Sequence, residues 1–188
     1  TILSYKKAKN CTFFLFLCKK TGKSMKKIAI FASGSGTNAE NIIRYYSRSE
    51  TVKVAVVLSN NPNAGVHARV NALGVPSFTF RREEFALGET VLNKLAAYEV
   101  ELIVLAGFMN KITEPLLAAY PNRIVNIHPA LLPKFGGKGM YGMHVHEAVV
   151  AAGERETGIT IHYINEQYDE GAILFQAKCP LLPTDTPE

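Results

Sequence analysis

The chain has 188 residues, the length of one ordinary domain, and its content of 47% hydrophobic and 20% charged residues is typical of a globular protein with a real core. The net charge of +5 is unevenly distributed, because residues 1–24 hold six of the 21 basic residues and none of the 16 acidic ones. The rest of the chain carries 15 basic against 16 acidic residues, a net charge of −1. This balance removes the main electrostatic argument for nucleic-acid binding, so we expect no nucleic-acid partner.

Residues 1–24 have the composition of a leader, with lysines around an apolar run from Cys11 to Cys18. That run is too short to span a bilayer and no small-x-small cleavage site follows it, so we expect no membrane association; an export signal is the alternative. We interpret Met25 as the natural start and residues 1–24 as non-native or disordered. Outside this segment only Cys179 remains, which cannot form a disulfide framework and favours a reducing, cytoplasmic location.

From Met25 onward, apolar runs alternate with segments of helical periodicity, and runs such as KIAIFA are typical of parallel strands buried on both faces. In chain order we expect a strand at 27–32, a helix at 37–47, a strand at 52–58, a helix at 64–73, a strand at 75–80, a helix at 82–98, a strand at 101–106, a short helix at 113–120, a strand at 123–128, a helix at 145–152, and strands at 157–164 and 172–177. This order predicts an α/β fold with a doubly wound, Rossmann-like, mostly parallel sheet and an antiparallel C-terminal addition.

Ligands of such sheets bind beyond the carboxyl ends of the strands, so the loops there are the candidates for chemistry. The first loop, S-G-S-G-T-N at 33–38, combines glycines with a helix N-terminus and favours a phosphate at Gly36, Thr37 and Asn38. It also matches the dinucleotide fingerprint G-x-G-x-x-A, but strand 52–58 is followed by S-N-N and not by the acid that a ribose requires. We therefore expect a phosphomonoester and no nicotinamide cofactor; a tight turn with a capped helix is the alternative.

The loop A-G-F-M-N-K-I-T at 106–113 places apolar residues at the same edge. Such residues usually belong to the core, but a loop of this kind can also hold a flat ring system through its backbone groups.

Strand 123–128 ends with Asn126 and His128, which project from the same face because they are two residues apart. An amide donor and an imidazole could stabilise an oxyanion and relay a proton, although a buried hydrogen-bonded core pair is the alternative. Pro129 and Pro133 stiffen the following turn, and the glycines of 136–142 predict a mobile lid.

Asp169 lies in the turn-like segment N-E-Q-Y-D-E-G at 165–171. A carboxylate near His128 would raise the pKa of that histidine and orient it or a bound water, whereas a solvated turn aspartate is the alternative. A zinc site built from His144, His146, His128 and His162 is also conceivable, but residues i and i+2 at the start of a helix do not face one ligand. We expect no metal.

The order of these four motifs resembles that of the phosphoribosylglycinamide formyltransferases from Met25 to Glu188. The pattern N-x-H-P-x-L-L-P with a later D-x-G is shared by the wider group of formyltetrahydrofolate-using enzymes, whereas the G-S-G-T-N loop is similar to the glycinamide ribonucleotide phosphate site. The resemblance implies one formyltransferase domain over residues 25–188, and we expect it to be cut before a last helix, which T-P-E at the end would open. A formyltetrahydrofolate deformylase and a non-catalytic phosphate-binding module of the same fold are the alternatives.

The resemblance implies an enzyme of de novo purine biosynthesis that transfers the formyl group of its co-substrate 10-formyltetrahydrofolate to the amine of 5'-phosphoribosylglycinamide. Asn126 and His128 would stabilise the tetrahedral oxyanion, while Asp169 would keep His128 protonated and organise a water that relays the proton. The implied binding residues are Gly36, Thr37 and Asn38 for the phosphate, and Met109, Asn110, Lys111, Ile112 and Asn126 for the folate. No metal is needed, because the folate carries the activated carbon.

Three features depart from the family pattern. Asn110 stands where a basic residue often follows the methionine, and Gly88 stands where a second basic residue is expected for the folate tail, a role for which Arg81 or Arg82 could substitute. The loop 136–144 is longer than its common form. These departures concern the contacts of the folate tail and not the reaction.

Overall fold

A computed structural model describes residues 25–187, so the predictions for residues 1–24 and for a helix that would continue through Glu188 lie outside the described residues. The described chain divides into two compact units, an N-terminal unit that ends at Val125 and a C-terminal unit that begins at Asn126. Each unit is described by itself.

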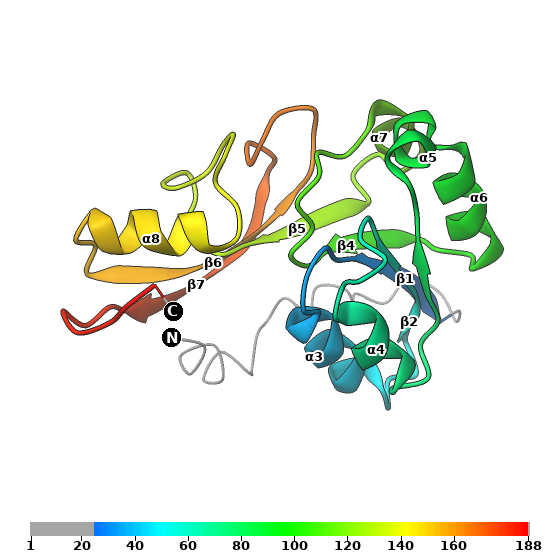
Figure 1. Cartoon of the computed structure of the whole chain (residues 1–188), viewed down its shortest axis with the longest axis horizontal. Coiled ribbons are helices and arrows are strands. Elements are labelled where there is room, and N and C mark those ends of the chain that lie inside the picture. Colours follow the sequence, from blue (N-terminus) through cyan, green and yellow to red (C-terminus); the bar gives the residue numbers. More distant parts are fainter. Residues whose placement is uncertain (1–24, 188) are drawn as a thin grey trace. The chain divides into compact units, whose positions relative to one another are not determined.

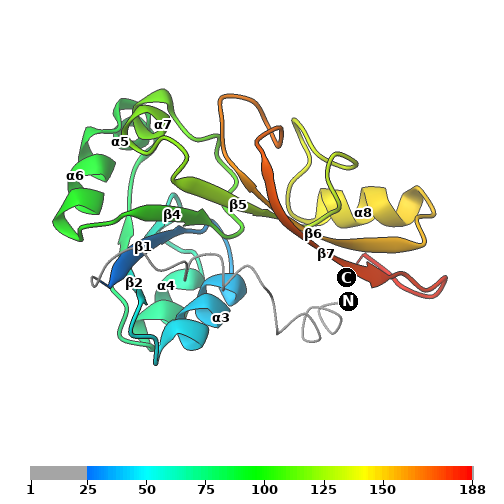
Figure 2. The same ribbon diagram turned by 180° about the vertical axis from the view of Figure 1, so that it is seen from behind.

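The N-terminal unit is built on parallel strands. They are β1 (Lys26–Phe31), β2 (Val52–Ser59), β3 (Ser77–Thr79) and β4 (Leu102–Leu105), in the order β3-β2-β1-β4. All three pairs are parallel, and β1, β2 and β4 are largely buried, whereas β3 is partly exposed. The helices are α3 (Thr37–Tyr46), α4 (Val66–Asn71), α5 (Arg82–Leu87), α6 (Glu89–Ala97) and α7 (Glu114–Ala119). Figures 1 and 2 show α3 and α4 together on one side of these strands, and α5, α6 and α7 on the other.

The prediction of a single helix at 82–98 is wrong, because the helix is interrupted at Gly88. This residue has φ 79°, a left-handed conformation that an L side chain rarely adopts, and a Cβ there would lie 2.7 Å from Cβ of Pro115. The amide of Gly88 ends α5 by donating to the carbonyl of Glu84, and its own carbonyl accepts from Leu92 in α6. An amphipathic pattern runs through both helices, so periodicity alone does not reveal the break.

Two other elements are shorter than predicted. The strand expected at 75–80 is reduced to Ser77–Thr79, an edge strand that pairs with β2. The helix expected at 64–73 is reduced to Val66–Asn71. At α7, Thr113 occupies the N-cap and Pro115 lies in the first turn as expected, but the Thr113 hydroxyl makes no capping bond.

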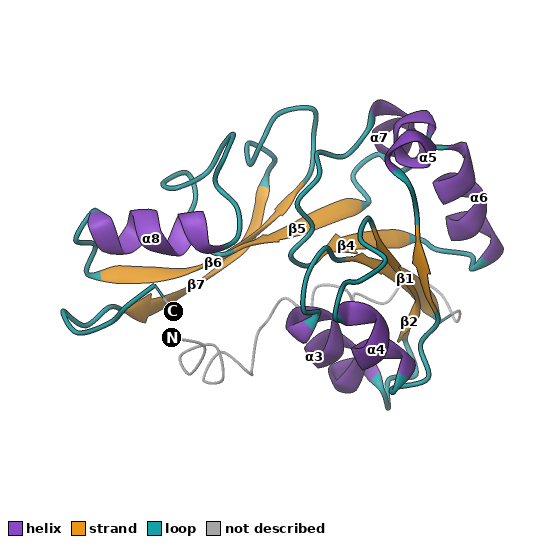
Figure 3. Cartoon of the chain, in the orientation of Figure 1, coloured by secondary structure: helices purple, strands orange, loops and turns teal. Residues whose placement is uncertain are grey.

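The described part of the C-terminal unit combines neighbouring strands with a helix (Figure 3). Its elements are β5 (Ile124–His128), whose last three residues belong to this unit, α8 (Met143–Ala151), β6 (Glu156–Tyr163) and β7 (Ile173–Pro180), with strand order β5-β6-β7. Strands β6 and β7 are antiparallel, from Glu156 opposite Pro180 to His162 opposite Ile173. The predicted α/β class, with a mostly parallel set of strands and an antiparallel C-terminal addition, is therefore confirmed.

A small apolar core holds α8 against the turn after β5. It contains Ala130, Val145 and Val149, against which Phe135 and Met140 pack. Within residues 25–187, no helix combines the length and the apolar character that crossing a membrane requires.

Candidate active site

The loop between β1 and α3 is shaped by a close approach of two helices. Gly36 is the N-cap of α3 with φ 78°, and a Cβ at this position would lie 2.5 Å from Cγ2 of Val66 at the start of α4. The amide of Val66 also donates to the carbonyl of Gly34 at 3.1 Å. Only glycine fits at position 36, and the first-turn N–H groups of α3, which have no partner within the helix, lie beside the side chains of Thr37 and Asn38. The loop can therefore hold an anion.

An acidic side chain in the first turn of α3 forms ion pairs with two arginines. Glu40 pairs with Arg69 at 2.7 Å and with Arg44 at 2.9 Å. The hydrogen bond from Arg69, followed by that from Arg44, holds the pKa of Glu40 below its ordinary value. The carboxylate is therefore ionised but compensated, and it does not oppose an anion at the helix N-terminus.

The loop between β4 and α7 lies beside the first one, because β1 and β4 are neighbouring parallel strands. The amide of Ser33 donates to the carbonyl of Gly107 at 3.0 Å, and the hydroxyl of Ser33 accepts from the amide of Met109 at 3.0 Å. Met109 is 53% exposed, and Asn110 and Lys111 are also exposed, whereas the side chain of Ile112 is buried in the core. Of the four residues predicted to bind folate in this loop, Ile112 can therefore contribute through its backbone alone.

In the C-terminal unit, the structure brings Asn126, His128 and Asp169 together in one polar cluster. Nδ1 of His128 lies 3.7 Å from Oδ2 of Asp169, and Nδ2 of Asn126 lies 3.2 Å from Nε2 of His162. Oδ1 of Asp169 lies 3.5 Å from the same nitrogen of His162. The four side chains thus form a chain of contacts, from Asn126 through His162 and Asp169 to His128, that joins the end of β5, the end of β6 and the loop before β7.

The protonation of His128 is set by its burial. Nε2 lies 2.8 Å from the carbonyl oxygen of Phe135 and must donate to it, so the neutral ring carries its proton on Nε2 and turns the lone pair of Nδ1 toward Asp169. Burial, the largest effect, lowers the pKa of His128, although Asp169 and the Phe135 carbonyl oppose it. Asp169 does raise the pKa of His128 as expected, but desolvation of the charged ring outweighs the carboxylate, so the net shift is downward.

Asp169 is held in its ionised form. Burial alone would raise the pKa of this carboxyl, but the nearby His162, the hydrogen bond from the amide of Gly137 and the charge of His128 together lower it. The Gly137 amide donates to Oδ2 at 3.0 Å. In the free protein the pair therefore consists of an aspartate and a neutral histidine at neutral pH.

Sequence reasoning missed the role of His162 in this cluster. The residue was weighed as a metal ligand, yet it is fully buried and joins Asn126 to Asp169, while its Nδ1 donates to the carbonyl of Tyr163 at 3.0 Å. The only signal was its place near the end of an alternating strand that leads to Asp169. His144 is exposed and His146 is half-buried; among residues 25–187, no group of three His, Cys, Asp or Glu side chains is placed to hold a metal ion.

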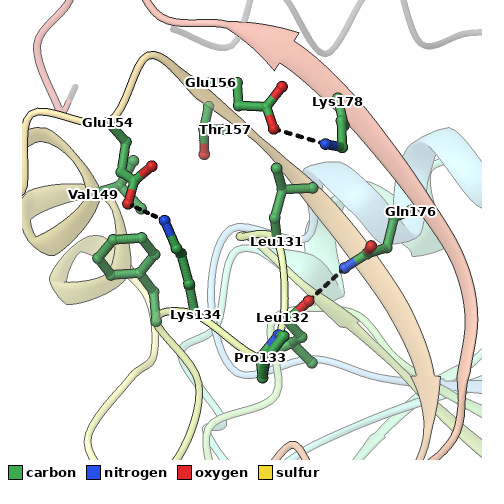
Figure 4. Close-up of a pocket in the computed structure, with 11 residues that line it drawn as sticks. Leu131, Leu132, Pro133, Lys134, Val149, Glu154, Glu156, Thr157, Gln176 and Lys178 are labelled. Atoms are coloured by element: carbon green, nitrogen blue, oxygen red, sulfur yellow. Dashed lines mark hydrogen bonds and ion pairs between the residues drawn. The ribbon is translucent and has the colours of Figure 1, made fainter.

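A cavity of about 240 Å³ lies on the C-terminal unit but does not contain the polar cluster (Figure 4). The turn 131–135 forms one wall, and two ion pairs, Lys134 with Glu154 and Lys178 with Glu156, each 2.7 Å long, flank it. None of Asn126, His128, His162 or Asp169 lines this cavity. The buried cluster is therefore separate from this cavity.

Comparison with known proteins agrees with this geometry. A family model described as formyl transferase matches residues 26–188. The chain belongs to the formyl transferase family. Among curated relatives, the formyl transferases named phosphoribosylglycinamide formyltransferase from Bacillus subtilis and Haemophilus influenzae are 38% and 37% identical, each over 87% of this chain and over 84% and 77% of their own length. The family resemblance stated from the motifs is thus confirmed.

Plant and structural relatives extend this picture. A chloroplastic phosphoribosylglycinamide formyltransferase of Arabidopsis thaliana is 41% identical over 87% of this chain, which spans 58% of that protein and 54% of its counterpart in Vigna unguiculata. The crystal structure of glycinamide ribonucleotide transformylase 1 from Geobacillus kaustophilus matches with a TM-score of 0.78 at 37% identity over 87% of both chains. A formyltetrahydrofolate deformylase from Pseudomonas syringae matches with a TM-score of 0.73 at 23% identity, covering 87% of this chain and 54% of that one, which shows a shared fold alone.

Proposed function

We propose that this chain transfers the formyl group of 10-formyltetrahydrofolate to the amine of 5'-phosphoribosylglycinamide, a step of purine biosynthesis. The observation that carries the proposal is the buried contact of His128 with Asp169, next to Asn126, in a member of the formyl transferase family. A formyl transfer passes through a tetrahedral oxyanion, and an amide donor beside an acid–base pair is the chemistry that such an intermediate requires.

The amine of the ribonucleotide attacks the formyl carbon, and the carbonyl oxygen becomes an oxyanion. One N–H of the Asn126 amide is directed at His162, which leaves its second N–H free to donate to that oxygen. The developing negative charge favours proton uptake by His128, and Asp169 stabilises the imidazolium that forms. The 3.7 Å between Nδ1 of His128 and Oδ2 of Asp169 is too long for a direct hydrogen bond and leaves space for a water to be shared.

The proton balance assigns a second task to the same pair. The attacking amine becomes positively charged in the adduct and loses a proton, and the folate nitrogen must gain one before it leaves. His128 and the water beside Asp169 relay this proton. The formyl group then remains on the amine, and tetrahydrofolate is released.

The two loops of the N-terminal unit supply binding. The N–H groups at the start of α3, with Gly36, Thr37 and Asn38, hold the ribose phosphate. The loop at 109–112 holds the pterin ring, with the exposed side chains of Met109, Asn110 and Lys111 and the backbone of Ile112. Asn126 contributes to both folate binding and catalysis.

Location and further ligands follow from the same proposal. We place the chain in the cytoplasm because Cys179, the one cysteine among residues 25–187, is free, which suits a reducing compartment. The partners are the two small molecules, with no nucleic acid and no membrane. The absence of a metal and of a nicotinamide cofactor stays a prediction, and full activity in a chelating buffer without nicotinamide would support it.

Release of tetrahydrofolate from 10-formyltetrahydrofolate, measured with and without 5'-phosphoribosylglycinamide, tests the proposal. Release that requires the amine supports the transferase. Release of equal rate without it would assign the chain to formyltetrahydrofolate hydrolysis. Binding of the ribonucleotide with no release from either mixture would leave a phosphate-binding module.

A further inference from the structure

Two residues that contact His128 adopt a backbone conformation that L residues rarely adopt. Phe135 has φ 55° and Asp169 has φ 56°, both in the left-handed region and neither a glycine. Such outliers persist only where the surrounding structure holds them, and they concentrate at functional sites. Both residues contact His128, Phe135 from the turn after β5 and Asp169 from the loop before β7.

The side chain of Phe135 fixes this turn. Its ring packs against the apolar core of Ala130, Val145 and Val149. With the ring anchored there, the left-handed backbone directs the carbonyl of Phe135 at Nε2 of His128, at 2.8 Å. The conformation therefore has a consequence for the histidine, because that contact admits only a protonated Nε2.

The next two residues close on Asp169. The amide of Gly137 donates to Oδ2 of Asp169 at 3.0 Å. Between the two contacts lies Gly136, where a Cβ would be 2.5 Å from Cδ2 of the buried Leu132 and 3.3 Å from Cβ of Asp169. Gly136 does not have a positive φ, so the requirement for glycine here comes from the close approach of the turn to Leu132, and to a lesser degree to Asp169, and not from backbone conformation.

We propose that the segment 135–137 is a positioning clamp, which holds one nitrogen of His128 through the Phe135 carbonyl and Asp169 through the Gly137 amide, so that Nδ1 alone exchanges the catalytic proton. Nε2 keeps its proton in both charge states because the Phe135 carbonyl accepts it. Protonation therefore adds the second proton on Nδ1, on the side of Asp169. The inference rests on the proposed function for the direction in which the proton travels, but the tautomer itself does not depend on it.

The groups that face the pair are few. Asp169 is faced by His128 from β5, by His162 from β6 and by the Gly137 amide, while the charge of His162 lowers the pKa of His128 and the charge of His128 lowers that of His146 in α8. Loss of the Gly137 contact removes a donor that lowers the pKa of Asp169. A loosened clamp should thus be visible in the acid limb of a pH–rate profile, which a general loss of folding would not move.

The direct test is a long-range ¹H–¹⁵N spectrum of the uniformly labelled protein at a pH where His128 is neutral, with His128→Gln assigning its signals. The expected result is a protonated Nε2 and an unprotonated Nδ1 for His128. A proton on Nδ1 would overturn the clamp, whatever the protein catalyses. If formyl transfer is absent but the tautomer is as expected, the proposed function fails and the clamp stands.

A pair of variants tests the clamp in turnover. Gly136→Ala adds the methyl group that meets Leu132 and Asp169, whereas Gly139→Ala strains the same loop at φ 91° but meets nothing within 4 Å. Displacements of this kind at an active site cost up to about 100-fold, so we expect Gly136→Ala to lower kcat by at least about tenfold, with little change in KM and with the acid limb shifted in pH. Equal effects of the two substitutions, or an unmoved acid limb, would contradict the clamp; a Gly136→Ala protein that fails to fold leaves the tautomer of the parent protein as the deciding measurement.

Discussion

Before substrate binds, His128 is neutral and Asp169 is negatively charged. Burial lowers the pKa of the histidine more than the carboxylate raises it, while the Gly137 amide and the two neighbouring histidines lower the pKa of the carboxyl in spite of its burial. The pair therefore carries one negative charge before substrate binds. This charge can stabilise a cation that forms only during the reaction, which is the property a proton relay needs.

The burial of His128 has a consequence for stability. Its pKa in the folded protein lies below the ordinary value of 6.5, so between these two values the unfolded chain binds more protons than the folded one. Stability therefore falls as the pH is lowered below about 6.5. Asp169, whose pKa is also lowered, adds a further loss as the pH falls below 3.8.

Denaturant unfolding at pH 7.5 and pH 5.5 checks this sign. The parent protein should be less stable at pH 5.5, and His128→Gln should lose less between the two values because the titrating group is gone. His144→Gln, at an exposed position, is the matched control and should behave like the parent. A variant His128→Gln with an unchanged pH dependence would show that other groups cause it.

Replacing Asp169 by asparagine separates the effect of its charge from the effect of its shape. Asp169→Asn keeps an oxygen that can accept from the Gly137 amide, but it removes the charge that stabilises the imidazolium. General acid–base catalysis contributes about 10²–10⁴-fold, so we expect a fall of that order in kcat for formyl transfer. Glu170→Gln, a neighbouring exposed carboxylate, should stay within about twofold of the parent; a similar loss in both variants would argue against a role for Asp169 in proton transfer.

Gly36 is another single residue whose replacement should have a measurable effect. A methyl group there would lie 2.5 Å from Cγ2 and 2.6 Å from Cα of Val66, on a residue with φ 78°. We expect Gly36→Ala to destabilise the protein by about 1–3 kcal/mol and to raise the KM for the ribonucleotide more than that for the folate. Adding Val66→Ala should not restore binding, because the backbone of Val66 still blocks the methyl group; restoration would mean that side-chain crowding alone was at fault.

At the level of elements, hydrophobic patterning predicts every strand of residues 25–187, as continuous apolar runs where the strand is buried on both faces, such as β1, and as alternation in the partly exposed β6. Boundaries are less accurate where another force decides them. The helix at 82–98 divides at Gly88, which adopts a left-handed conformation close to Pro115 of α7; the glycine is a local signal for a helix end, but the hydrophobic periodicity continues across it. The short β3 reflects its position at the edge of the strands, where only one neighbour holds it.

One hydroxyl connects the elements of the C-terminal unit. Oγ1 of Thr160 in β6 donates to the carbonyl of Ala130 at 2.7 Å and accepts from the amide of Leu132 and from Nε2 of Gln176, each at 2.9 Å. These bonds attach the turn after His128 to β6 and β7. A buried donor left without a partner costs about 1–3 kcal/mol, which makes the hydroxyl important for the position of the turn.

Thr160→Val, which preserves volume and removes the hydroxyl, should therefore lower the free energy of unfolding by about 1–3 kcal/mol. Thr157→Val on the same strand lines the surface cavity and should change stability by no more than about 0.5 kcal/mol. Chemical denaturation of both variants gives the comparison. A small effect at position 160 would mean that water replaces the lost bonds.

For the whole molecule, the sequence indicates the site better than it indicates the contacts within it. The order of glycine loop, apolar loop, N-x-H-P motif and D-x-G segment points to the chemistry, since each motif follows a strand. It does not reveal His162, whose partners Asn126 and Asp169 lie 36 residues before it and seven after it. Nor does it reveal the net pKa of His128, because burial is a property of the packed structure and not of the local sequence.

The central claim is that the cluster around His128 transfers a formyl group to the amine of a ribonucleotide. The measurement that tests it most directly is the rate of tetrahydrofolate release with 5'-phosphoribosylglycinamide, together with the Kd of that ribonucleotide, in the parent protein and in His128→Ala. We expect amine-dependent release in the parent, a loss of about 10²–10⁴-fold in the variant, and a Kd that changes little. Turnover by His128→Ala at the rate of the parent would contradict the account.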